Sequence, residues 1–141
     1  QPEPKDEAMS WQTIAIVVAV VAAVGVYIFK YFNSKLADPE LAEIRQSLAA
    51  GARLVDVRTP GEFASGHVDG AINIPVSQLS SKLKKLGQKR KPLVVYCRSG
   101  SRSGHAVSFL RQQGFKHVLD MKAMSNWAAI HAAPSEATAT R

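Results

Sequence analysis

The chain has a single cysteine, Cys97, and its neighbours are of the types that make a thiol reactive. It ends a short apolar run and precedes a loop in which small residues separate two cations: Arg98, Ser99, Gly100, Ser101 and Arg102. Backbone N–H groups of such a loop can turn inward around an anion, and a following helix adds its positive end. These features favour the thiolate, which is the nucleophilic form of cysteine. The residues predict a reactive Cys97 that could carry a persulfide or face a bound dianion; the alternative is a core cysteine beside solvated arginines.

The cysteine count and the charge balance exclude several other functions. One cysteine allows neither a disulfide within the chain nor a cysteine-rich zinc site, and we expect no metal and no cofactor. The formal net charge of +7 suits anionic partners, and a basic cluster lies between residues 82 and 91. No aromatic residues interleave with this cluster, so we expect no nucleic-acid partner. We interpret the cluster first as the solvated face of a helix, and second as a surface for anionic lipid or an acidic partner.

The order of the expected elements indicates how Cys97 is positioned. Apolar runs typical of buried strands cover residues 53–57, 71–74, 93–96 and 118–119, and helical patterns separate them at 38–50, 77–86, 103–113 and 124–132. Thr59 and Glu62 have the spacing of a capping box. Strands that alternate with helices predict an α/β fold with a mostly parallel sheet covered on both faces. In such a sheet, ligands bind where strands end, which is where Cys97 lies.

The apolar segment before this domain is long enough to cross a membrane. Residues 11–32 contain the uncharged run IAIVVAVVAAVGVYIF, with Trp11 at one end and Tyr27 and Tyr31 at the other, and such rings prefer the membrane interface. We predict one transmembrane helix at 11–32, after a short acidic tail at 1–10. The run is too long for the apolar part of a signal peptide, and so small a domain could not bury it as a core helix.

The charges and small residues of this segment concern its orientation and assembly. Lys30 and Lys35 follow the helix closely, which predicts a single-pass protein of the inner or plasma membrane with its C-terminal domain in the cytoplasm. Ala15, Ala19 and Ala23 recur at every fourth position, a pattern that allows a homo-oligomer through close helix packing, although we favour alanine being merely tolerated in lipid. A linker at 33–38, a globular domain at 39–133 and a flexible tail at 134–141 complete the expected organisation.

Two motifs of the globular part resemble those of rhodanese domains. The first is Asp56-Val57-Arg58, followed by Glu62-Phe63 and by the run from Gly66 to Pro75; the second is the loop from Cys97 to Arg102. The resemblance implies a rhodanese-like fold with about five parallel strands between helices. It also implies a thiosulfate sulfurtransferase: a cysteine takes sulfane sulfur from a small anionic donor, such as thiosulfate, or from a persulfide donor, and passes it to cyanide or a thiol. With the apolar helix, the chain is expected to be a membrane-anchored sulfurtransferase.

The resemblance also implies roles for particular residues. Cys97 would hold the persulfide, the amides from Arg98 to Arg102 would line the pocket, and Arg102, with Arg98 as a second candidate, would orient the donor. Asp56, Arg58 and His67 match the first motif, where their role is mainly structural. For His67 a general-base role is the alternative, but we favour a bond to the local backbone.

One position departs from the family pattern. The family usually places two adjacent glycines after the last strand, whereas this chain has Lys122 and Ala123 there, ahead of the matching aromatic Trp127. If the backbone needs a positive φ at either position, the residue is strained. Lys122 would also add positive charge at the rim of the pocket.

Two other functions compete with sulfur transfer. Cysteine phosphatases and arsenate reductases also use a cysteine in an anion-binding loop, but they place an arginine six residues after it, where this chain has Ser103. A shorter loop suits a sulfur atom on the cysteine better than a tetrahedral phosphate. The second alternative is a non-catalytic, membrane-tethered sulfur carrier or binding module.

Overall fold

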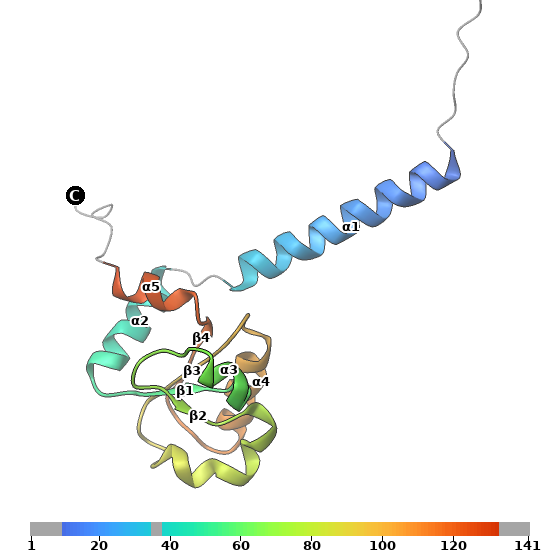
Figure 1. Cartoon of the computed structure of the whole chain (residues 1–141). Helices are drawn as coiled ribbons and strands as arrows, with labels where there is room; N and C mark the ends of the chain where they lie inside the picture. The colour runs from blue at the N-terminus through green and yellow to red at the C-terminus, as the bar shows by residue number, and fades with distance from the viewer. Residues whose placement is uncertain (1–9, 35–37, 133–141) are drawn as a thin grey trace, which may run out of the picture. The chain divides into compact units, whose positions relative to one another are not determined.

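The computed structural model describes residues 10–34 and 38–132, whose helices and strands are shown in Figure 1. The chain divides into two units, residues 1–32 and residues 33–141, and each is considered by itself. The expected acidic tail up to residue 9, the centre of the linker and the expected C-terminal tail lie outside the described residues.

The first unit is dominated by one long apolar helix, α1, Trp11–Ser34. Ser10 caps it, because the Ser10 Oγ accepts a hydrogen bond of 3.3 Å from the Thr13 N–H. Every side chain from Trp11 to Tyr31 is exposed, and this stretch of 21 residues is long and apolar enough to cross a membrane. At about 1.5 Å per residue it matches a hydrocarbon core of about 30 Å.

The second unit is built on a parallel sheet of four strands among the described residues: β1 Arg53–Asp56, β2 Ile72–Asn73, β3 Leu93–Cys97 and β4 Val118–Ala123. Their order is β2-β1-β3-β4, and every pairing is parallel. We expected about five strands; four form a sheet of the same α/β type. The β3 strand lies centrally, between β1 and β4, and all five of its residues are buried. This explains why its sequence is apolar without alternation.

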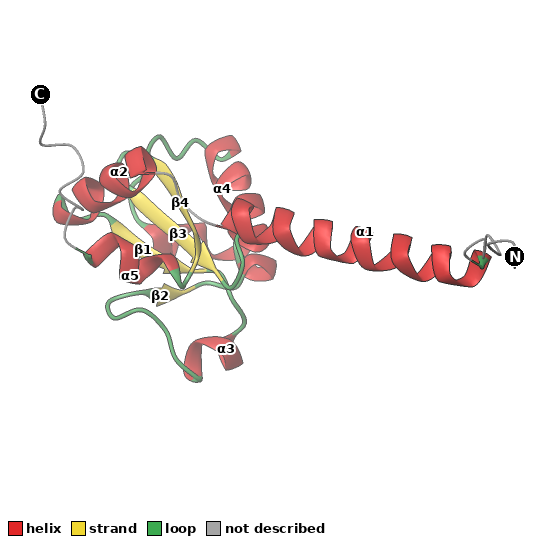
Figure 2. Cartoon of the chain, turned by 90° about the horizontal axis from the view of Figure 1, so that it is seen from above, coloured by secondary structure: helices red, strands yellow, loops and turns green. Residues whose placement is uncertain are grey.

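Helices cover both faces of the sheet, as Figure 2 shows. Helices α2, Asp38–Ala49, and α5, Asn126–His131, pack on one face, and α4, Ser101–Gln112, packs on the other. Alternate β3 side chains point to the two cores: Val95 and Cys97 lie in the core under α4, and Val94 and Tyr96 lie in the core under α2 and α5. The strand therefore delivers Cys97 to the edge of one core, directly before α4 begins.

The segment expected as one amphipathic helix at 77–86 forms two short 3₁₀ helices, Val76–Gln78 and Ser80–Leu86, with a non-helical kink at Lys82. Its apolar pattern was interpreted correctly, since Leu79 and Leu86 are buried and Leu83 packs against the same core. Lysines project from the other side. A 3₁₀ helix places i and i+3 residues on one side as an α-helix does, so the periodicity alone could not separate the two.

Candidate active site

Cys97 is the last residue of β3, and the loop after it leads straight into α4. Gly100 is the residue before the helix and has φ of +99°, a conformation that an L-residue rarely adopts. This turn directs the Gly100 N–H to the Cys97 Sγ, at 3.1 Å. The backbone dipole and the start of α4 thus both face the sulfur, an arrangement that suits a negatively charged sulfur atom.

The thiol is enclosed rather than open to solvent. Cys97 is 0% exposed, whereas Arg98 and Ser99 in the following loop are exposed. The arrangement combines features of both sequence interpretations, because Cys97 belongs to the apolar core on one side and to the polar loop on the other. The exposed residues of the loop therefore follow Cys97 in the sequence, while the thiol itself faces the core.

Sequence reasoning did not give Ser103 a role, yet it lies next to the thiol. It is fully buried, and its Oγ is 3.7 Å from the Cys97 Sγ. Its hydroxyl donates to the Gly100 carbonyl oxygen at 3.0 Å, which fixes the first turn of α4 against the loop. The sequence does show a small polar residue six positions after the cysteine, in the first turn of the expected helix. An ordinary helical serine could occupy the same position, so this spacing does not indicate a contact with the thiol. The structure thus places a neutral hydroxyl where a cysteine phosphatase would have its arginine.

Arg102 lies in the first turn of α4 and is held by Glu62 of the short helix α3, Pro60–Ala64. The two side chains form a bidentate ion pair, with Nη1–Oε2 at 2.7 Å and Nη2–Oε1 at 2.8 Å. The hydrogen bonds from Arg102 hold the pKa of Glu62 well below its usual range, and those to Glu62 raise the pKa of Arg102. Arg102 lies in the chain between Gly100 and Ser103, whose N–H and Oγ are 3.1 Å and 3.7 Å from the Cys97 Sγ.

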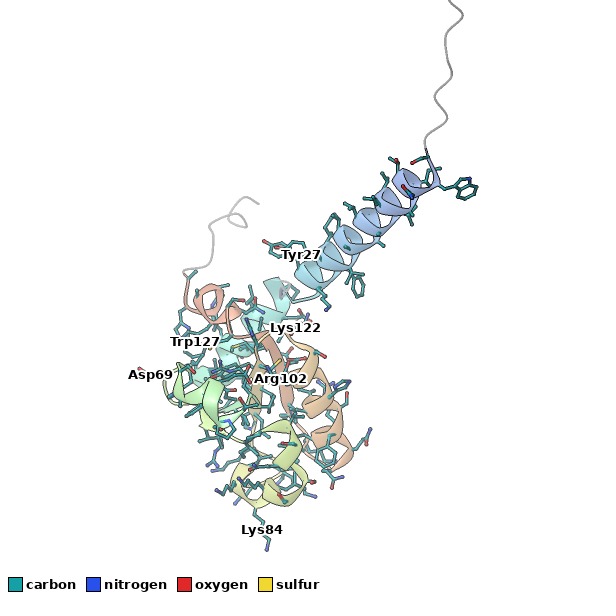
Figure 3. The ribbon with its side chains drawn as sticks, turned by 45° about the vertical axis from the view of Figure 1, so that its right-hand side comes forward. Tyr27, Asp69, Lys84, Arg102, Lys122 and Trp127 are labelled. Atoms are coloured by element: carbon teal, nitrogen blue, oxygen red, sulfur yellow. The ribbon has the colours of Figure 1, made fainter. Side chains whose placement is uncertain are left out.

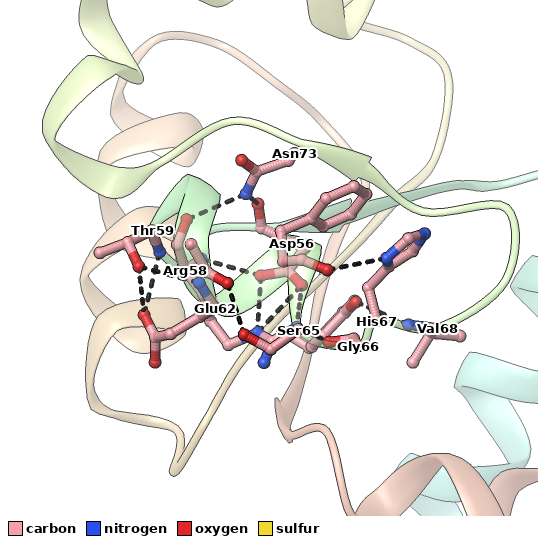
Figure 4. Close-up of polar contacts among 12 residues, drawn as sticks. Asp56, Arg58, Thr59, Glu62, Ser65, Gly66, His67, Val68 and Asn73 are labelled. Atoms are coloured by element: carbon pink, nitrogen blue, oxygen red, sulfur yellow. Dashed lines mark hydrogen bonds and ion pairs between the residues drawn. The ribbon is translucent and has the colours of Figure 1, made fainter.

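The first motif forms a buried polar network at the end of β1, shown in Figure 4. Asp56 accepts from the Arg58 guanidinium, with a closest distance of 2.7 Å, and the same guanidinium donates to the Gly66 carbonyl at 2.7 Å. Asp56 is 0% and Arg58 is 6% exposed. The hydrogen bond to Asp56 raises the pKa of Arg58. The network ties β1 to the loop before β2.

His67 contacts the local backbone in the way that we favoured. Its Nδ1 is 2.9 Å from the Phe63 carbonyl oxygen, and its ring stacks on the Phe63 ring with centroids 3.7 Å apart. Next to it, the Val68 N–H donates to the Tyr96 hydroxyl at 3.1 Å, and burial raises the pKa of Tyr96 to about 12. These contacts connect the loop to β3, one residue before Cys97.

Lys122 adopts the positive φ that the family pattern suggested for its position. Its φ is 62°, and among the described residues it is the only non-glycine residue with a positive φ. The β3–β4 register shifts at this point, so Lys122 pairs with Tyr96 and Ala123 pairs with Cys97. The Lys122 Cβ faces Gly100, where an added methyl group would come within 3.2 Å of it. The backbone of Lys122 therefore lies directly against the cysteine loop.

The Lys122 side chain leads away from the thiol. Its ammonium group pairs with Glu40 of α2 at 3.4 Å, and both residues line a cavity of about 400 Å³ together with Asp120. Asp120 accepts from the Lys122 N–H at 2.7 Å, and burial raises the pKa of Asp120. Cys97 does not line this cavity.

Lys84 of the basic cluster lies at one end of the domain in Figure 3, with Arg102 between it and Lys122. Among the described residues, no group of three or more potential ligands could hold a metal ion.

Comparisons with known proteins identify the family of the globular unit. A family model described as rhodanese-like domain matches residues 40–129. A sulfurtransferase of Allochromatium vinosum is 39% identical over 69 residues, which is 49% of this chain and 64% of that protein. The human thiosulfate:glutathione sulfurtransferase is 40% identical over 89 residues, covering 53% of this chain and 77% of the human protein.

A solved structure agrees with these matches. The human single-domain sulfurtransferase TSTD1 superposes with a TM-score of 0.57 at 31% sequence identity, covering 70% of this chain and 98% of that chain. The chain spans 56% to 67% of the length of three curated bacterial relatives that it matches. Since the family model covers well over half of the sequence, this chain belongs to the rhodanese-like domain family.

Proposed function

We propose that the chain is a membrane-anchored sulfurtransferase in which Cys97 carries sulfur as a persulfide. The observation that carries the proposal is the Gly100 N–H directed at the Cys97 Sγ at 3.1 Å, where β3 ends and α4 begins. A backbone donor and a helix start stabilise a thiolate and, after transfer, a persulfide anion. The names of the relatives support the same chemistry.

The reaction divides into two nucleophilic displacements. The Cys97 thiolate attacks the sulfane sulfur of thiosulfate; a new S–S bond forms, the bond to the sulfonate sulfur breaks, and sulfite leaves with the electron pair. The acceptor then attacks the outer sulfur of the persulfide, so that cyanide becomes thiocyanate and the thiolate returns. Because the chain has one cysteine, this acceptor must come from outside the chain.

The second part of the proposal is that helix α1 anchors the chain in a membrane. Helix α1 has the length and composition of a membrane span, and its side chains from Trp11 to Tyr31 are exposed. Lys30 lies near the C-terminal end of α1 and Lys35 follows it, whereas Lys5 precedes it, so the positive-inside tendency supports a cytoplasmic rhodanese-like unit.

A thiosulfate:cyanide assay on the full chain in detergent tests the activity. We expect thiocyanate formation that Cys97→Ser abolishes, and a gain of one sulfur atom in the intact mass after thiosulfate treatment. Ser108→Ala is a matched control, since Ser108 is exposed on α4, outside the cysteine loop, and the variant leaves the cysteine intact. Absence of both turnover and mass gain would reject sulfur transfer and leave a binding module.

Alkaline carbonate extraction of cell membranes tests the anchor. The unaltered chain should stay in the membrane pellet, and Val17→Lys combined with Val21→Lys should release it, because each lysine in the centre of a span costs about 3 kcal/mol. Release of the unaltered chain would contradict a spanning helix.

A further inference from the structure

Arg102, the cation expected to receive the donor, already has an anion on it. Both of its terminal nitrogens are bound by the Glu62 carboxylate, at 2.7 Å and 2.8 Å. A bidentate carboxylate satisfies the fork of a guanidinium as fully as an oxyanion substrate would. A donor that binds the paired terminal N–H groups of Arg102 therefore competes with a group of the chain itself, and a donor at the remaining N–H groups lies close to the Glu62 charge.

Glu62 is also held in place from its other side. The Thr59 N–H and the Thr59 hydroxyl each donate to the Glu62 Oε2 at 3.0 Å, and the Glu62 N–H donates back to the Thr59 Oγ1, which completes the capping box of α3. The carboxylate would thus stay near Arg102 even when an anion displaced it. Its depressed pKa keeps it ionised at neutral pH.

The pair is accessible to small solutes. The side chain of Arg102 is 32% exposed and that of Glu62 is 29% exposed, so a dissolved anion can reach both. Moreover, Arg102 lies in the chain between Gly100 and Ser103, whose N–H and Oγ are 3.1 Å and 3.7 Å from the Cys97 Sγ, so the pair lies next to the residues that contact the sulfur. A negative charge on a bound donor therefore lies near the negative charge of Glu62.

We propose that Glu62 is a specificity-determining residue that competes with the sulfur donor for Arg102 and so disfavours donors in proportion to their negative charge. The inference rests on the proposed sulfur transfer at Cys97. A dianion such as thiosulfate meets twice the repulsion that a monoanionic thiosulfonate meets. The site accordingly favours donors with a single negative charge.

Glu62→Gln in the full chain tests this selection, because glutamine keeps the length and the acceptor oxygen of a capping box but removes the charge. We expect kcat/KM for methanethiosulfonate to rise about twofold and kcat/KM for thiosulfate to rise about fourfold, since the Coulomb energy scales with donor charge and a doubled energy squares the factor. Thr59→Ala is the matched control: it weakens the capping box, leaves both charges in place and should not change the ratio of the two donors.

A second measurement does not depend on turnover. Cys97 is the only thiol, so its alkylation can be followed with iodoacetate, which is anionic, and with iodoacetamide, which is neutral. Glu62→Gln should raise the ratio of the iodoacetate rate to the iodoacetamide rate about twofold. If no donor is turned over, the proposed function fails while this ratio still tests Glu62. An unchanged ratio in Glu62→Gln, or an equal change in Thr59→Ala, would overturn the inference.

Discussion

The positive φ of Lys122 gives a prediction about stability that can be worked out in numbers. A non-glycine residue in the left-handed region costs about 1–2 kcal/mol, and glycine removes that cost. Glycine in turn gives the unfolded chain more freedom, which costs about 0.5–1 kcal/mol. The ion pair between Lys122 and Glu40 is partly exposed, with side chains 24% and 49% exposed, and contributes at most about 1 kcal/mol. Because Lys122→Gly loses this pair, comparison with the unaltered chain would mix two effects.

Lys122→Ala separates them, because it loses the same ion pair but keeps the strained φ. We expect Lys122→Gly to be more stable than Lys122→Ala by about 0.5–1 kcal/mol, or about 2–8 °C in Tm for a unit of this size. Urea unfolding of the full chain in detergent, followed by near-ultraviolet circular dichroism, measures the difference. If Lys122→Ala proved equal to or more stable than Lys122→Gly, position 122 would not be strained and the reasoning from φ would be wrong.

Three further predictions concern the neighbouring contacts. Gly100→Ala should lower both stability, by about 1–3 kcal/mol, and thiocyanate formation, since its φ is +99° and its new methyl group would lie 3.2 Å from the Lys122 Cβ; adding Lys122→Gly should recover part of the loss. Asp56→Ala should cost about 3–5 kcal/mol in urea unfolding because it leaves the buried Arg58 uncompensated, and Asp56→Ala with Arg58→Met should cost less than Asp56→Ala alone. Folding lowers the pKa of Glu62, so the Glu62 carboxylate contributes to stability above pH about 4.5 and this contribution is lost as the pH falls. The Tm difference between the unaltered chain and Glu62→Gln should therefore shrink between pH about 6 and pH about 3. A constant Tm difference would contradict the ion pair.

Much of the fold follows from local patterns in the sequence. The continuous apolar run at 93–96 predicted a central buried strand, and β3 is buried at every residue. The spacing of Thr59 and Glu62 predicted a capping box, and both of its hydrogen bonds form. Patterns failed where two structures share a periodicity: the segment at 77–86 is 3₁₀ rather than one helix, and β4 extends beyond the two residues expected. The expected strand ended too early because strands are predicted from apolar runs, and β4 contains the polar residues Asp120 and Lys122.

For the site, the sequence by itself determined which residue is the nucleophile candidate and which loop surrounds it. Cys97, the small residues after it and the helix that follows are adjacent in the chain, and local turn chemistry brings the Gly100 amide to the sulfur. The tertiary structure alone decided that Arg102 is paired with Glu62, 40 residues away, and that Lys122 lies against Gly100. These contacts depend on how strands pair and helices pack across the sheet, and residue spacing carries no information about such distances. The tertiary structure also showed that the thiol is enclosed, because burial is set by everything that packs around a residue and not by its neighbours in the chain.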